Sequence, residues 1–334
     1  MDETIPAIEI RDLRKRYDDV EALRGIDLTI SSGQFFGLLG PNGAGKSTTI
    51  HILTGLVTFR HGTARVLGRD VVDDYRFTRR RIGLAPQEFN FDRFFPIRQI
   101  LVLHAGYYGV PREEAERRAD ELLDRFGLAE KAEQKIHKLS GGMKRRLLIA
   151  KAMIHDPDIL ILDEPTAGID VELRRSLWRY LRRLNDLGKT VLLTTHYIEE
   201  AEALCEEVAI IDRGRIVARG SPDHLIQTGG ERSLEIRLTE PPGDGLPEAV
   251  AERDPRLEGE RLTIDHPNPR RIVAGVLRNL YEAGLEITEV RIVKSSLEDV
   301  FVQLTGHPIE EPLEPDAVEA RATADPLEEE LHEI

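Results

Sequence analysis

Short apolar runs alternate with amphipathic segments over most of the first 228 residues. Apolar and polar residues alternate with period two at Ile8–Ile10 and Ile26–Ile30, which predicts half-buried strands. Ile159–Leu162 and Thr190–Leu193 are continuous apolar runs, typical of central parallel strands that are buried on both faces. Residues 112–126 place their apolar side chains on one helical face. The pattern predicts an α/β domain that includes some antiparallel strands.

A second, smaller region follows at 229–306. Strands are predicted at Leu234–Leu238, Leu262–Ile264 and Ile287–Val293, and helices at Arg270–Ala283 and Leu297–Leu304. Strands and helices in this order indicate a small α+β accessory domain. A chain of 334 residues has room for both domains, since one domain usually takes about 100–200 residues.

Charge is unevenly distributed along the chain. The formal net charge is −14, and residues 307–334 carry ten acidic side chains against one arginine. This acidic tail has too few apolar residues to fold alone. The rest of the chain is nearly balanced, which argues against a nucleic-acid partner, because such proteins usually show a basic stripe. No run of about 18 apolar residues occurs, so we expect no direct insertion into a membrane.

A glycine-rich loop carries the clearest chemistry. Gly40-Pro41-Asn42-Gly43-Ala44-Gly45-Lys46-Ser47 fits the phosphate-loop pattern, between an apolar strand at Phe35–Leu39 and a helix that begins near Thr48. Glycines let successive backbone N–H groups face an anion, and the helix N-terminus adds its positive dipole. Lys46 is expected to reach the β- and γ-phosphates, and Ser47 to ligate Mg²⁺.

Two adjacent carboxylates, Asp163 and Glu164, follow the apolar run Ile159–Leu162. Open α/β sheets bind ligands at the carboxyl ends of their strands. Asp163 is therefore expected to hold Mg²⁺, and Glu164 to polarise a water in line with the γ-phosphate.

A second candidate anion site is Ser140-Gly141-Gly142, at the start of an apolar-faced helix. Two half-sites on one chain favour a head-to-tail homodimer that sandwiches each nucleotide. Taken alone, the motif is also compatible with an ordinary helix capped by Ser140.

In this order the motifs resemble those of the ATP-binding subunit of ABC transporters, over about Ile8 to Thr228. The resemblance implies that Tyr17 stacks on adenine, that Gln87 meets both Mg²⁺ and the attacking water, and that His196 senses the γ-phosphate. It also implies that Asp170 acts in trans with Ser140–Gly142. Each of Tyr17, Gln87 and His196 also has an ordinary structural reading: a strand aromatic, a loop residue and a helix cap.

The resemblance also implies the fold of a domain at 1–228. This domain would contain a P-loop NTPase core of RecA type, an antiparallel β subdomain and a helical subdomain at about 88–157. The C-terminal α+β extension at 229–306 and the acidic tail at 307–334 follow. Met143 replaces the glutamine that most ABC proteins have after the two glycines, but it fits type-2 exporters of the daunorubicin-resistance kind. The Leu297–Gly306 segment is also similar to that subgroup's C-terminal extension.

The implied function is ATP hydrolysis that drives export through a separate permease of about six transmembrane helices. The subunit would then lie peripherally on the cytoplasmic face of the cell membrane. The segment Phe89–Phe95 carries four phenylalanines and ends before Pro96, so it is the candidate docking surface for the permease. A ribosomal ABC protein, a DNA-repair ABC ATPase and a P-loop kinase are weaker alternatives. The cargo is not encoded here.

Overall fold

The computed structural model describes residues 5–166, 169, 171–229, 233–243, 245–266, 269–293 and 296–306. Two compact units divide the chain, with the boundary between Val217 and Ala218. This boundary lies inside the strand Arg215–Gly220. The domain boundary at 228, which comes from the sequence pattern, stays a prediction. The predicted acidic tail at 307–334 and Asp170 fall outside the described residues. No helix in the described parts of the chain is long and apolar enough to cross a membrane.

The first unit begins with an antiparallel sheet in the order β2-β1-β4-β5. Its strands are β1 (Ile8–Tyr17), β2 (Val20–Ile30), β4 (His61–Val66) and β5 (Arg69–Asp70). Alternate residues of β1 and β2 are buried, because only one face of this sheet packs on the core. This sheet supplies the predicted antiparallel part of the domain.

The second sheet of this unit positions the candidate site. Its order is β10-β9-β3-β8-β7-β6, with strands β10 (Arg215–Gly220), β9 (Glu207–Asp212), β3 (Phe35–Leu39), β8 (Thr190–Thr195), β7 (Ile159–Asp163) and β6 (Ile82–Ala85). β9, β3, β8, β7 and β6 run parallel. Every residue of β7 and β8 is buried, which confirms the reading of these runs as central strands. Leu39 pairs with Thr195, and Asp163 with Thr194, so the three strands end together.

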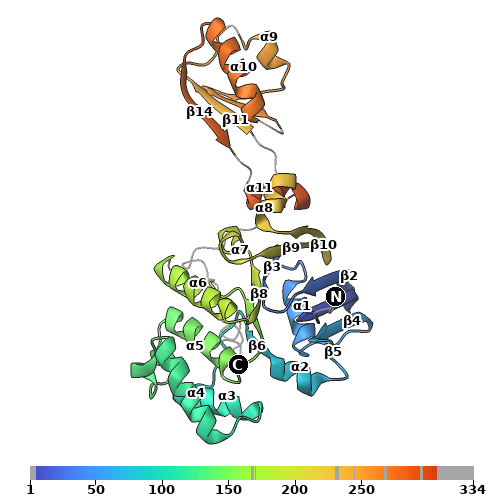
Figure 1. The fold of residues 1–334 in the computed structure, drawn as a ribbon, viewed down its shortest axis with the longest axis vertical. Coiled ribbons are helices and arrows are strands. Elements are labelled where there is room, and N and C mark those ends of the chain that lie inside the picture. The colour runs from blue at the N-terminus through green and yellow to red at the C-terminus, as the bar shows by residue number, and fades with distance from the viewer. Residues whose placement is uncertain are drawn as a thin grey trace, which may run out of the picture. The chain divides into compact units, whose positions relative to one another are not determined.

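Helices complete the first unit. The helices that connect strands of the two sheets are α1 (Lys46–Leu53), α2 (Tyr75–Arg81), α6 (Val171–Asp186) and α7 (Ile198–Leu204). A helical group contains α3 (Ile97–Tyr107), α4 (Arg112–Arg125), η1 (Ala129–Lys131), η2 (Ile136–Lys138) and α5 (Gly141–Met153). Figure 1 shows α3 and α4 gathered away from the antiparallel sheet, with α5 between them and the parallel sheet.

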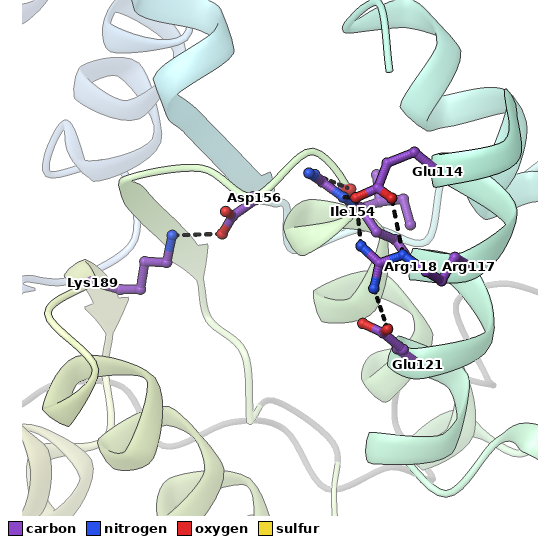
Figure 2. Close-up of polar contacts among 7 residues, drawn as sticks. All are labelled: Glu114, Arg117, Arg118, Glu121, Ile154, Asp156 and Lys189. Carbon is purple, nitrogen blue, oxygen red and sulfur yellow. Dashed lines mark hydrogen bonds and ion pairs between the residues drawn. The ribbon is translucent and has the colours of Figure 1, made fainter. Parts of the chain in front are cut away.

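The Arg118 side chain joins α4 to the C-cap residue of α5, Ile154, as Figure 2 shows. Glu114 accepts hydrogen bonds from Arg117 and Arg118, and these bonds lower the pKa of Glu114 to about 2. Arg118 also donates to the carbonyl of Ile154 at 3.4 Å. The ion pairs of Glu114 lie within α4 at partly exposed positions, so each adds little to the stability of the fold.

The C-terminal unit, described by itself, has the order of elements βαββαβ. These are β11 (Ser233–Leu238), α9 (Glu248–Ala251), β12 (Arg256–Glu258), β13 (Arg261–Asp265), α10 (Pro269–Glu282) and β14 (Ile287–Val293). The sheet order β12-β13-β11-β14 is that of a ferredoxin-like split βαβ arrangement. Ile272, Val276 and Leu280 form one buried face of α10 against this sheet. Two further helices, α8 (Pro222–Gly229) and α11 (Leu297–Thr305), contact each other.

Candidate functional site

The glycine-rich loop connects β3 to α1, as the sequence predicts. Gly43 and Gly45 have φ of 79° and 113°, in the left-handed region that glycine adopts without strain. A Cβ on Gly45 would lie 2.7 Å from Leu23 Cδ2 and 2.9 Å from the Ala22 carbonyl oxygen. A Cβ on Gly40 would lie 2.3 Å from the Ile211 carbonyl oxygen. The loop therefore passes close to β2 and β9, where larger residues do not fit.

The remaining residues of the loop differ in exposure. The backbone N–H of Ala44 donates to Pro41 at 3.2 Å, and the Ala44 carbonyl accepts from Gly214 at 2.9 Å. Asn42 is exposed, while Ser47 and Thr48 are half-buried at the start of α1. The loop is thus anchored on its core side and open on the other, as a binding loop requires.

Lys46 is buried, with 5% of its side chain exposed. Its ammonium group donates to the Gly40 carbonyl at 2.6 Å and to the Pro41 carbonyl at 3.1 Å. It also lies 4.0 Å from Glu164 Oε1. Burial lowers the pKa of Lys46, although the Glu164 and Asp163 carboxylates oppose this shift. The lysine is thus a cation held inside the loop by two carbonyl oxygens that a phosphate could replace.

Asp163 is the last residue of β7 and is buried. The hydroxyl of Thr194, on the neighbouring strand β8, donates to Asp163 Oδ1. Glu164 follows in a left-handed conformation with φ of 48°, and its N–H donates to the Thr194 carbonyl at 3.0 Å. Left-handed φ is uncommon outside glycine and is often found at functional sites. This turn separates the two carboxylates, which the sequence places side by side.

Glu164 is the centre of the candidate site. Gln87 Nε2 donates to Glu164 Oε2 at 2.8 Å, and His196 Nδ1 lies 3.2 Å from Oε1. Burial by itself raises the pKa of Glu164, but His196, Lys46 and Arg145 outweigh it and the pKa lies below its ordinary value. Glu164 is therefore ionised at neutral pH and can accept a proton.

His196 does not cap the following helix. The N-cap of α7 is Tyr197, whose N–H donates to the Thr195 hydroxyl at 2.9 Å. Nε2 of His196 is buried and makes no hydrogen bond among the described residues. Buried polar atoms are normally satisfied, so this atom is available to a ligand.

The second half-site lies at the start of α5. Ser140 is the N-cap, and its hydroxyl accepts from the Met143 N–H at 3.3 Å, which confirms the predicted cap. A Cβ on Gly142 would lie 2.2 Å from Leu173 Cδ2. Within the part of the chain that the structure describes, no hydrogen bond or ion pair joins Ser140, Gly141 or Gly142 to the phosphate loop.

Tyr17 ends β1 and is 40% exposed. The Lys15 ammonium lies over one face of its ring, 4.6 Å from the centroid. Its exposure leaves ring surface for an adenine base.

Two site residues escaped the sequence analysis. Thr194 holds Asp163, and Arg145 contacts the segment around Gln87. Thr194 lies in an otherwise apolar strand, where a hydroxyl group gives a weak indication of a functional residue. Arg145 lies in a basic run, where nothing distinguishes a buried arginine from its exposed neighbours.

Relatives of the chain cover nearly all of its length. A Nod factor export ATP-binding protein I of Ralstonia nicotianae is 38% identical over 306 residues, which is 90% of this chain and 94% of the relative. The daunorubicin/doxorubicin resistance ATP-binding protein DrrA of Streptomyces peucetius is 39% identical over 332 residues, or 95% and 98% of the two chains. The ABC transporter family description matches residues 23–167. This chain belongs to the ABC transporter family.

Solved structures agree with this assignment. The structure of an ATP-binding subunit of an ABC transporter is 30% identical, with a TM-score of 0.62 and coverage of 67% of this chain and 93% of that one. A dimeric ATP-binding cassette with ADP and Pi bound, in a post-hydrolysis state, is 28% identical with a TM-score of 0.59, over 64% and 98%. The expected family and ABC-type nucleotide-binding fold are confirmed. As an ABC ATPase of the type-2 exporter kind, the chain binds ATP and hydrolyses it.

Proposed function

We propose that this ABC ATPase powers export of a substrate across the cell membrane through a separate transmembrane permease subunit. The observation that carries the proposal is the ionised Glu164, bonded to Gln87 and held beside His196 and Lys46. The names of two relatives, for Nod factor export and for daunorubicin resistance, support outward transport. Because those names concern different compounds, no cargo is assigned to this chain.

The nucleotide would lie across both sheets of the first unit. Adenine stacks on the uncovered face of Tyr17, and the phosphates lie in the loop formed by Gly40, Pro41, Asn42, Gly43, Ala44, Gly45, Lys46, Ser47 and Thr48. Lys46 exchanges its two loop carbonyls for β- and γ-phosphate oxygens. This exchange is favourable because an anion replaces neutral acceptors around a buried cation.

The side-chain chemistry of Asp163, Ser47 and Gln87 fits Mg²⁺. Asp163 supplies a buried carboxylate, Ser47 a hydroxyl and Gln87 an amide oxygen, and hard oxygen ligands are those that Mg²⁺ prefers. When bound, Mg²⁺ neutralises charge on the phosphate oxygens. Thr194 keeps the Asp163 carboxylate oriented through its hydroxyl.

Hydrolysis follows from the surroundings of Glu164. Glu164 orients a water and accepts its proton, the water oxygen bonds to the γ-phosphorus, and the bond to the bridging oxygen breaks to leave ADP and phosphate. Gln87 donates to the Glu164 carboxylate and would also orient the water. His196, with its unbonded Nε2, donates to the γ-phosphate and so distinguishes ATP from ADP.

The second half-site would serve the nucleotide of a second copy. Ser140, Gly141, Gly142 and Asp170 contact ATP in trans in a head-to-tail homodimer. Among the described residues, no hydrogen bond or ion pair links Ser140–Gly142 to the chain's own phosphate loop, which supports this arrangement. A dimeric solved relative supports it as well.

The Phe89–Phe95 segment is the proposed docking surface for the permease. Phe94 is 80% exposed and Phe89 43%, so neither ring is used in the core. Aromatic side chains contribute strongly to interfaces. The partner would be a permease of about six transmembrane helices, and the subunit would lie on the cytoplasmic face of the cell membrane.

Affinity purification tests the proposal directly. A tagged chain is purified from membranes in mild detergent with ATP present, and the co-purifying proteins are identified. We expect a multi-helix permease and stimulation of phosphate release in its presence. Recovery of ribosomes or DNA in its place would contradict the export function.

A further inference from the structure

Arg145 is a buried arginine whose partners are unusual. It lies on α5, close behind the turn Ser140–Gly142, and is 4% exposed. Buried arginines usually pair with a carboxylate. Over the described residues, Arg145 has no carboxylate within ion-pair distance, and its Nε makes no hydrogen bond. Burial lowers the pKa of Arg145, although Glu164, Asp163 and Glu200 oppose this shift.

The partners that Arg145 does have belong to the segment that begins the docking surface. Its Nη1 donates to the Gln87 carbonyl at 3.0 Å and to the Pro86 carbonyl at 3.3 Å. Its guanidinium carbon lies 5.0 Å from the centroid of the Phe89 ring. The Arg145 side chain thus holds the backbone of Gln87 and packs on the ring of Phe89, the first aromatic residue of the docking surface.

A second cation of α5 repeats the arrangement further along the segment. Lys151 Nζ lies 5.6 Å from the centroid of the Phe91 ring and donates to the Asn90 carbonyl at 3.4 Å. Phe89 and Phe91 are stacked, with centroids 6.4 Å apart. The segment from Gln87 to Phe91 therefore contacts α5 at Gln87, Phe89, Asn90 and Phe91.

We propose that Arg145 is a positioning residue, which couples α5 and the docking segment to hydrolysis by holding the Gln87 backbone so that the Gln87 amide orients Glu164. The proposal rests on the roles given above to Gln87 and Glu164. Movement of α5, whether caused by ATP at the Ser140–Gly142 turn or by the permease at Phe89, reaches Glu164 through Arg145. In this proposal Arg145 acts through the Gln87 backbone and not on the reacting atoms.

The expected effect is on turnover rather than on nucleotide affinity. A displacement of about 1 Å in a positioned catalytic group can cost about 100-fold in rate. Arg145→Met removes the carbonyl contacts and the charge. Arg145→Lys keeps the charge, but a lysine does not reproduce the flat guanidinium over Phe89 or its fork of donors. We expect both variants to lower kcat by about 10- to 100-fold and to change the ATP Kd by less than about threefold.

Arg146 provides a matched control on the same helix. It also donates to a backbone carbonyl, that of Phe126 at 2.7 Å, but it has no described contact with the Gln87 segment. Arg146→Met removes an arginine from the neighbouring position of α5, one that is half-buried where Arg145 is buried. A purely structural role for Arg145 therefore predicts the same kinetic change in both Met variants.

The experiment measures steady-state phosphate release against ATP concentration, with ATP Kd and melting temperature, for the full-length chain and the three variants. A lowered kcat at unchanged Kd in the Arg145 variants, with kcat in Arg146→Met within about threefold of the parent, supports the proposal. Normal kcat in the Arg145 variants, or an equal loss in Arg146→Met, overturns it. If Arg145→Met does not fold, Arg145→Lys decides by the same criteria. Normal hydrolysis by Glu164→Gln would instead overturn the catalytic roles themselves.

Discussion

Gln87 Nε2 donates a 2.8 Å hydrogen bond to Glu164 Oε2 and joins the segment after β6 to the end of β7. Glu164 is in addition held through its backbone N–H by the Thr194 carbonyl of β8. Three neighbouring strands of the parallel sheet thus determine the position of one carboxylate. Because Gln87 lies just before the exposed rings of Phe89 and Phe94, the docking surface is close in sequence to the side chain that contacts the proposed base, Glu164.

The head-to-tail dimer predicts that two inactive variants restore activity when mixed. Lys46→Ala disables the phosphate loop and Ser140→Arg blocks the second half-site, so each homodimer carries the same defect in both sites. A mixed dimer has one site with both defects and one intact site. We expect ATPase activity to recover partially on mixing, as measured by phosphate release.

Subunit exchange must be demonstrated in the same sample, for example by co-purification through a tag on one variant. Mixed dimers that form but remain inactive would argue for a nucleotide site completed within one chain, or for strict coupling between the two sites. Ser140→Arg also removes a helix cap worth about 1 kcal/mol, so both variants are first checked by melting temperature.

The docking surface predicts a variant that separates ATPase activity from assembly. Phe94→Asp places a charge on a ring position that is 80% exposed, so the fold is expected to tolerate it. The charge opposes burial against an apolar partner. Phosphate release by the isolated subunit should persist, while co-purification with the permease falls.

A matched control for this variant is Tyr281→Asp, at an aromatic that is also 80% exposed but belongs to the C-terminal unit. Equal loss of the permease in both variants would contradict a specific role for the segment. Phe91→Asp is informative in a second way. If it lowers the melting temperature and abolishes ATP binding, the half-buried Phe91 ring serves the fold and not the interface.

His155 predicts a component of acid instability. Its ring stacks on Tyr108 with centroids 3.6 Å apart, and its Nε2 lies 3.0 Å from the Ile82 carbonyl oxygen. Burial lowers the pKa of His155 to about 4. Below about pH 6.5 the unfolded chain binds a proton that the folded chain does not, so this contribution to stability falls as the pH goes down toward 4.

His155→Phe keeps a flat ring against Tyr108 and removes the titration. Its absolute stability is expected to be lower because the bond to the Ile82 carbonyl is lost, but its loss of stability on acidification should be smaller. Between about pH 7 and pH 5 we expect the parent to lose about 1–2 kcal/mol more than the variant in free energy of unfolding. Parallel pH profiles would contradict the assignment of this loss to His155.

The sequence predicted many of the strands and helices and the place of the glycine-rich loop, but not α9 or β12 of the C-terminal unit. The buried strands β7 and β8 followed from continuous apolar runs, and the phosphate loop followed from glycine spacing, because both are local patterns. The cap at Ser140 followed in the same way. The features that the sequence did not predict depend on contacts between segments that are distant in sequence. The split βαβ order of the C-terminal sheet, the Thr194–Asp163 bond and the burial of Arg145 belong to that class.

Steady-state phosphate release by Glu164→Gln tests the central claim most directly. The variant keeps the shape of the side chain and a hydrogen-bond acceptor for Gln87, but a neutral amide does not take a proton from water. We expect ATP binding to remain and turnover to fall by about 10²–10⁴-fold, with accumulation of an ATP-bound dimer on a sizing column. Hydrolysis at the rate of the parent, with ATP binding intact, would contradict the role of Glu164 and the account of the site built on it.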